Sequence, residues 1–197
     1  MGNIINYKFS DKITMDYMDN TEDNLERWLK LVEENTHKGF INLSKKNITE
    51  IPIDWNPDGI HALFLHKNNI SEIPMDWNPR NITELNLNHN NISEIPMNWN
   101  PGSITILFLH KNNISEIPMD WNPGNLNVLA LSDNNISEIP MDWNPGNIEY
   151  LDLCYNNISE IPMDWNPGNI TRLFIDKDVK INFNWIKKYP NVEIMNL

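Results

Sequence analysis

Apolar residues recur along most of the chain with a fixed period of 22 residues. Ile-Pro pairs begin at Ile51, Ile73, Ile95, Ile117, Ile139 and Ile161, and a tryptophan follows each of these isoleucines four positions later. A fixed period of this length indicates a solenoid, in which each repeat forms one coil and buries its apolar face against the neighbouring coils.

Each repeat contains a short segment in which apolar and variable residues alternate. In one copy, Leu63 and Leu65 are expected to point into the coil and Phe64 to point outward, because successive side chains of a strand face opposite ways. Stacked coils then place these strands side by side in a parallel sheet. Asn68 and its equivalents follow the strands, where their amides can satisfy turn backbone groups and form a ladder between coils.

The segment that follows each strand contains a proline, which lacks a backbone donor and argues against a regular α-helix there. The tryptophan of each repeat is expected to fill the wide side of its coil with one large ring. The "NPGN" sequence then closes the coil, with proline predicted at the second position of a type I turn.

A stack of coils exposes apolar ends, so capping segments are required. Thr21–Gly39 is predicted to be an amphipathic helix that covers the first coil, with Thr21 or Asp23 as its N-cap and Gly39 as its stop. "FNWIKKYP" predicts a short helix near the other end, and "NVEIMNL" predicts a last strand. These elements divide one structural domain into a helical cap (1–38), repeats (39–182) and a C-terminal cap (183–197).

The aligned copies follow the pattern I-x-x-L-x-L-x-x-N-x-I-x-x-I-P-x-x-W-x-P. This pattern resembles the leucine-rich-repeat signature over about residues 38–182. The resemblance implies an α/β repeat fold, a right-handed solenoid with a parallel sheet on its concave face and irregular Pro/Trp segments on its convex side. The Asn-rich style is also similar to short 22-residue-repeat proteins of giant DNA viruses, of the mimivirus kind.

The formal net charge of −12 argues against nucleic acid and anionic membranes as partners, and it favours basic protein surfaces. Cys154 is the single cysteine, so no disulfide framework is expected. The first residues lack the apolar core of a signal peptide, which predicts a cytoplasmic location, in the host cell if the protein is viral. Gly2 could accept a myristoyl group, although Asn6 stands where the motif has Ser or Thr.

No sequence motif for a nucleotide loop, a serine hydrolase or a zinc protease is present, so neither catalysis nor a cofactor is expected. Cys154 is predicted to lie on the sheet surface without a nearby base. His66 and His110 stand two coils apart, roughly 10 Å by strand spacing, which is too far for one metal ion to bridge. The sequence therefore predicts no metal site.

The outward positions of the strands vary from repeat to repeat, whereas the inward positions do not. Packing fixes the inward residues, and the outward ones are free to specify a partner, so we predict a monomer that binds a protein partner through the concave face. The predicted contact residues are Phe64, His66, Lys67, Asn86, His89, Phe108, His110, Lys111, Asp133, Tyr150, Asp152 and Tyr155.

Three alternatives are also compatible with the sequence. Neutral drift on a solvated face would also produce variable outward residues. A structural role would use the last strand or the acidic columns, such as Glu72 and its equivalents, for self-association. A third possibility is a glycan or cation binder that uses the tryptophan or acidic columns.

Overall fold

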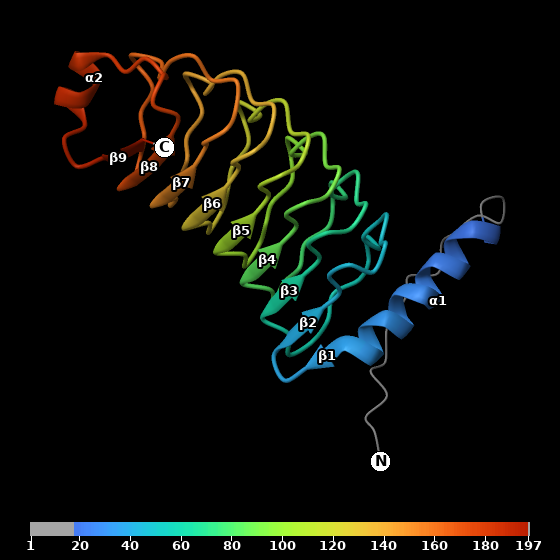
Figure 1. The fold of residues 1–197 in the computed structure, drawn as a ribbon. Coiled ribbons are helices and arrows are strands. Elements are labelled where there is room, and N and C mark those ends of the chain that lie inside the picture. The colour runs from blue at the N-terminus through green and yellow to red at the C-terminus, as the bar shows by residue number, and fades with distance from the viewer. Residues whose placement is uncertain (1–17, 197) are drawn as a thin grey trace.

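A computed structural model describes residues 18–196, with side chains from Asn24 onward. Strands of these residues form a single sheet of nine members in chain order (Figure 1). The two helices are α1 (Met18–Asn35) and α2 (Phe183–Lys188). The strands are β1 (Thr36–His37), β2 (Phe40–Asn42), β3 (Ala62–Phe64), β4 (Glu84–Asn86), β5 (Ile106–Phe108), β6 (Val128–Ala130), β7 (Tyr150–Asp152), β8 (Arg172–Ile175) and β9 (Glu193–Asn196).

Strands β2 to β8 pair in parallel, and each residue pairs with its equivalent in the next repeat, as Leu63 pairs with Leu85. The two leucines of each L-x-L segment have no exposed surface, because the pleat turns both of them into the coil. The sequence prediction of a parallel-sheet solenoid is therefore confirmed.

The predicted asparagine ladder is present between the coils. Asn112 donates through its Nδ2 to the carbonyl oxygens of Leu87 (3.1 Å) and Leu109 (2.9 Å), and its Oδ1 accepts from the backbone N–H of Ile92 (3.0 Å). Its side chain is 7% exposed. One amide thus satisfies three buried backbone groups and ties two coils together, which explains why this residue type recurs.

The repeat tryptophans form a continuous buried column. The rings of Trp99 and Trp121 lie 6.5 Å apart and within 3° of parallel, and the same stacking continues to Trp143 and Trp165. Each indole N–H from Trp77 onward donates to the carbonyl oxygen of the tryptophan one coil earlier, as Trp121 does to Trp99 at 3.0 Å. The column therefore fills the coils and also satisfies its own polar atoms.

Residues 43–182 form turns and extended segments between the strands, without a helix. Pro123 accepts a hydrogen bond from the N–H of Leu126 (3.2 Å), so the closing turn begins at proline and places Gly124 at its second position. Gly124 has a φ of +61°, which a type I turn does not contain. The prediction of a type I turn with proline at the second position is therefore wrong for this copy.

The N-terminal helix begins and ends earlier in the chain than predicted. Helix α1 ends at Asn35, and the chain then forms a hairpin in which β1 pairs antiparallel with β2 around Gly39, whose φ is +84°. Trp28 and Val32 are buried on the face that covers the first coil, as expected for an amphipathic cap. Thr21 and Asp23 both lie inside α1, which already begins at Met18, so the prediction that one of them is the N-cap is wrong. Gly2 lies outside the described residues.

The C-terminal cap contains both predicted elements. The side chain of Asn182 accepts a hydrogen bond from the N–H of Asn184 (2.8 Å) and so caps α2. Trp185 in this helix is buried against the last coil. Strand β9 then returns to pair in parallel with β8 and ends the sheet.

Candidate partner-binding surface

The twelve predicted contact residues all belong to the outward-facing side of the sheet, called here the sheet face. It consists of the first and third residues of β2 to β8 together with the two outward positions that follow each strand. Lys67, Lys111, Asp133 and Tyr155 are exposed, and the other predicted residues are half-buried. Adjacent coils bring some of these side chains into contact and keep others apart.

At the N-terminal end of the sheet face, Phe64 contacts Phe40 with ring centroids 6.0 Å apart, and Phe40 contacts His37 at 5.0 Å. Phe64 and Phe108 are separated by Asn86, which pairs with both of them in the sheet register. The sequence prediction therefore missed Phe40 as the partner of Phe64. Phe40 is the first residue in one of the columns of outward positions, so its position in the repeat could have indicated that it lies on the sheet face.

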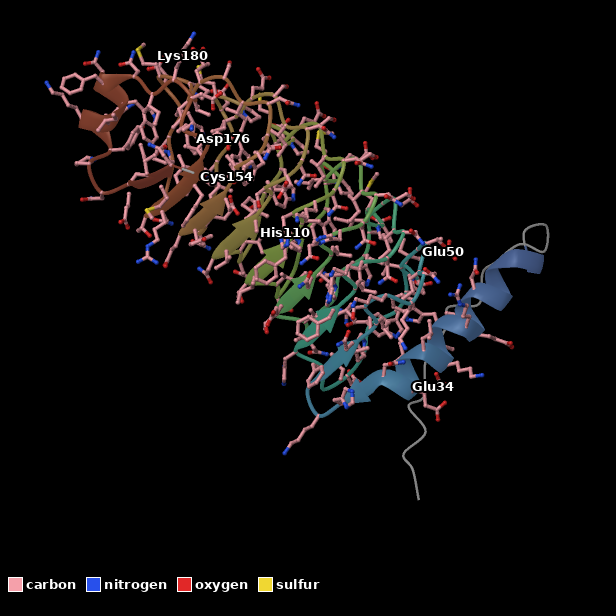
Figure 2. All side chains as sticks on the ribbon, viewed as in Figure 1. Glu34, Glu50, His110, Cys154, Asp176 and Lys180 are labelled. Atoms are coloured by element: carbon pink, nitrogen blue, oxygen red, sulfur yellow. The ribbon has the colours of Figure 1, made fainter. Side chains whose placement is uncertain are left out.

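Histidines gather in the middle of the N-terminal half of the sheet face. The rings of His89 and His110 lie 6.0 Å apart, and the ring of Phe108 lies 6.2 Å from that of His110 (Figure 2 labels His110 beside the strands). Burial lowers the pKa of His66, His89 and His110 below the ordinary value of 6.5, and neighbouring positive charges lower it further. The histidine cluster is thus held toward its neutral form.

At the C-terminal half of the sheet face, Tyr150 packs against Phe174 with ring centroids 4.6 Å apart. Burial raises the pKa of Tyr150 above 10, with Asp152 adding to the effect, so the phenol stays protonated. Arg172 lies beside Glu193 with its Nε 3.5 Å from the carboxylate. Phe174 and Arg172 were not among the predicted contact residues, although both occupy outward columns.

One outward column has an unusual backbone. Lys45, Lys67, His89, Lys111, Asp133 and Tyr155 adopt φ values between 53° and 59°. This left-handed conformation is disfavoured for residues with a side chain. In most coils a backbone hydrogen bond to the next coil stabilises this conformation. The N–H of Lys67, for example, donates to the carbonyl oxygen of Asn88 (3.0 Å). The geometry recurs in each coil and is therefore a property of the fold, one that the sequence did not signal.

Cys154 differs from its prediction. It was expected on the sheet surface, but it is 1% exposed, although its place in the repeat is the outward one near β7 and β8 (Figure 2). Burial raises the pKa of its thiol to about 12, and Asp152 and Asp176 contribute in the same direction. A protonated, buried thiol is a poor nucleophile, so Cys154 acts as a packing residue.

A polar groove that the sequence did not predict runs across four coils at the start of the strands. It has a volume of about 720 Å³ and is lined by Ser103, Thr105, Asn125, Asn127, Asn147, Glu149, Asn169 and Thr171. Several of its amides are already engaged, as Asn125 donates to the carbonyl oxygen of Gly102 (2.9 Å). The groove is therefore mostly an internally bonded polar surface.

The described residues offer neither a metal centre nor a membrane-spanning helix. Among residues 24–196, whose side chains are described, no three side chains of the His, Cys, Asp and Glu types converge closely enough to hold a metal ion. Neither described helix is both long enough and apolar enough to cross a membrane.

Comparisons with known proteins agree with this geometry. A family model described as Leucine Rich Repeat matches residues 81–101 and 147–167. The chain is similar to a leucine-rich-repeat protein of Leptospira interrogans, with a TM-score of 0.54 and 23% identity over 70% of this chain and 37% of that one. It is also similar to a chain in the crystal structure of PEPR1–AtPEP1, with a TM-score of 0.53 and 25% identity over 71% of this chain and 21% of that one.

The chain thus spans less than half the length of either structural neighbour. A comparison with curated proteins gives no match. The stacked coils and their parallel sheet define a solenoid repeat protein. Within that class, the leucine-rich-repeat model matches two of the repeats, and the two solved structures share the solenoid fold.

Proposed function

We propose that this protein is a non-catalytic recognition module that binds a protein partner through the sheet face. The observation that carries the proposal is the contrast between the two sides of each strand. The inward leucines are the same in most coils, whereas the outward residues differ from coil to coil and include half-buried aromatics with charged neighbours. Such a mixture of aromatic anchors and a polar rim is typical of protein interfaces.

In the proposed complex, Phe64, Phe108 and Tyr150 act as anchors, and Tyr155 adds an exposed ring at the C-terminal half. The charged side chains orient the partner: Lys67 and Lys111 act on one half of the sheet face, and Asp133 with Asp152 on the other. Asn86 and the three histidines supply hydrogen-bonding groups within the N-terminal half. The binding mode is rigid display, because a stacked sheet changes little on binding.

The neighbouring structure, PEPR1–AtPEP1, is named for two components together, which is consistent with recognition by this fold. On the resemblance of the Asn-rich repeats to those of giant DNA viruses, we further propose that the protein acts as a monomer in the cytoplasm of an infected cell. Its partner there is a protein of the host or of the virus.

Strand β9 favours a second function, self-association. It ends the sheet and pairs with β8 on one side, so its other edge is available to a strand of another copy, and Met195 within it is 37% exposed. Light scattering over a concentration series tests this alternative. A mass that rises with concentration supports it, and a constant monomer mass contradicts it.

The recognition function is tested by capturing partners from cell lysate on immobilised protein. The sheet-face variant carries Phe64→Ala, Lys67→Ala, Phe108→Ala and Lys111→Ala. The control variant changes Ser71, Ser93, Ser115 and Ser137 to Ala, which are exposed serines of the same repeats away from the strands. All three proteins must melt at similar temperatures before they are compared.

A protein that binds the wild type and the control but not the sheet-face variant supports the proposal and identifies the partner. Equal retention by all three proteins contradicts it, because the proposed anchors would then contribute nothing. Retention lost equally in both variants would also contradict the assignment to the sheet face.

A further inference from the structure

A row of exposed apolar side chains runs along the solenoid on the segments that connect one strand to the next. It consists of Ile53, Met75, Met97, Met119, Met141 and Met163, which are 49–56% exposed, and it is called here the Met stripe. Glu50, one of the exposed residues just before the stripe, lies on the side of the first coil away from the strand arrows (Figure 2). The Met stripe is therefore a surface separate from the sheet face.

Folding does not require an apolar residue at these positions. Met75 lies inside a turn in which the N–H of Trp77 donates to the carbonyl oxygen of Pro74 (3.0 Å), and its side chain points away from the core. Turn positions of this kind are usually polar. The first repeat differs from the others in several letters, yet it keeps an apolar residue here, Ile53. A file of exposed apolar residues on a soluble fold marks an interaction surface.

Acidic side chains accompany the Met stripe in each coil. Each of the six stretches contains an exposed glutamate three residues before the stripe, and five contain an aspartate directly after it. The glutamates are Glu50, Glu72, Glu94, Glu116, Glu138 and Glu160, and the aspartates are Asp54, Asp76, Asp120, Asp142 and Asp164. The sequence between each glutamate and the following tryptophan contains no Lys or Arg.

These carboxylates lack a positive partner within the described part of the chain. The ion pair found among residues 24–196 joins Arg172 to Glu193, and it involves no member of the acidic columns. The stripe is therefore apolar in its middle and negative beside it. A second copy of this chain or an anionic membrane would bring more negative charge to the same surface, and repulsion disfavours both.

The length of the stripe suits an α-helical partner. The stacked tryptophans next to the stripe lie 6.3–6.5 Å apart from Trp99 to Trp165, which measures the step between coils on this side. The apolar face of an amphipathic helix repeats about every 5.4 Å along the axis, which is close to this step but not equal to it. A helix of about 20 residues is about 30 Å long, so when it lies along the solenoid its apolar face can contact most of the stripe.

We propose that the Met stripe binds a basic amphipathic α-helix of a partner protein. The apolar face of that helix packs on the methionines, whose flexible thioether side chains adapt to its shape. Lys and Arg side chains at the edges of the same helix pair with the glutamate and aspartate columns. This site lies on a different surface from the sheet face and stands or falls independently of the function proposed there.

A defined probe tests the proposal directly. The probe is a fluorescently labelled synthetic peptide of about 20 residues, built from Leu and Lys so that its leucines fall on one helical face. A second peptide of the same composition has its residues rearranged so that no apolar face forms. A third replaces each Lys by Glu. We expect the full-length protein to bind the first peptide and to bind the other two at least about tenfold more weakly.

Protein variants locate the binding surface. The stripe variant changes Met75, Met97, Met119 and Met141 to Gln, and its control changes Ser71, Ser93, Ser115 and Ser137 to Gln. The charge variant changes Asp76, Asp120 and Asp142 to Asn, and the chain itself shows that Asn is tolerated there, because Asn98 occupies the same place. Thermal melting confirms that each variant is folded before binding is measured.

We expect the stripe variant to bind the basic peptide about tenfold more weakly or worse, and the serine control to bind as the wild type does. The charge variant should bind more weakly at low salt and show a smaller salt dependence. Equal binding by the stripe variant, or equal binding of the rearranged peptide, would overturn the proposal, because general attraction to negative charge would then explain the result. Concentration-dependent dimerisation through the stripe, or binding to neutral lipid vesicles that the stripe variant loses, would overturn it in favour of another occupant.

Discussion

Trp185 continues the tryptophan column although it does not belong to a repeat. Its indole N–H donates a 2.9 Å hydrogen bond to the carbonyl oxygen of Trp165, and the two rings lie 6.1 Å apart and within 5° of parallel. Helix α2 thus closes the solenoid by presenting the same ring and the same donor that a further coil would present. At the other end, the indole N–H groups of Trp28 and Trp55 are buried without a partner among the described residues.

The first prediction concerns the hydrogen bonds of this column. Trp121→Phe keeps a ring in place but removes the N–H that bonds the carbonyl oxygen of Trp99. We expect the free energy of unfolding to fall by at least about 1–3 kcal/mol, because a buried carbonyl loses its partner and the smaller ring also leaves a cavity. Met119→Gln in the same coil should change it by less than about 0.5 kcal/mol. Urea unfolding measures both, and equal effects would contradict the role given to the N–H.

A second prediction separates the two asparagines of one repeat. Asn112→Ala removes a side chain that satisfies three backbone groups, and we expect a loss of about 3 kcal/mol or more. Asn113→Ala changes an exposed side chain next to it and should cost less than about 0.5 kcal/mol. Chemical denaturation of both variants checks the difference. Similar losses would mean that the ladder does not hold the coils together.

The third prediction concerns the reactivity of Cys154. Because its thiol is buried and its pKa is raised to about 12, a thiol reagent such as iodoacetamide should label the folded protein slowly at mildly alkaline pH. Unfolding in urea should restore the rate of an ordinary cysteine. Mass spectrometry over time measures both rates. Fast labelling of the folded protein would show that the thiol is accessible.

The fourth prediction concerns pH. The pKa values of His66, His89 and His110 are lowered in the folded state, so the unfolded chain binds protons more readily near and below the ordinary pKa of 6.5. Stability should therefore be complete above that pH and should fall as the pH decreases through the folded pKa values. NMR titration of the ring protons should place all three below 6.5.

A triple variant provides the control for this pH dependence. His66, His89 and His110 are changed to Asn, and urea unfolding of wild type and variant is compared at about pH 7.5 and about pH 5.5. The variant should lose less stability than the wild type between these values. An equal loss would assign the pH dependence to the carboxylates instead.

The repeat part of the fold could be predicted from the sequence because each recurring residue of the repeat has a single structural role. Leu63 and Leu65 alternate with Phe64, which defines a strand and its inward face. Asn112 recurs at a position where three backbone groups need a partner. With near-identical copies, one assignment repeated along the chain gives the register of the sheet.

The ends and the turns were less predictable, because there the structure depends on local geometry that a repeat does not reveal. Gly39 signals a positive φ, but the sequence does not say whether that angle ends a helix or turns a hairpin, and here it turns a hairpin. Gly124 signals a positive φ in the same way, yet the turn begins one residue later than predicted.

The sequence predicted which residues lie on the sheet face, but it did not predict which of their side chains contact one another. The repeat assigns Phe64 and Tyr150 to the sheet face, whereas the distances to Phe40 and Phe174 depend on side-chain conformation. Cys154 shows the same limit, because an outward position can still be covered by its neighbours. The Met stripe was not predicted because its residues recur as regularly as the core residues do. A regular apolar position in a repeat can be either buried or exposed.

The hydrogen bond from Trp121 to Trp99 spans 22 residues, and the same bond recurs from coil to coil. Each middle coil therefore makes the same contacts with the coil before it and the same contacts with the coil after it. Gain or loss of one whole copy leaves every junction intact, so we expect related genes to differ in length by multiples of one repeat, as unequal recombination between near-identical DNA segments produces. Such length variation would extend or shorten both exposed surfaces at once while leaving the interior unchanged.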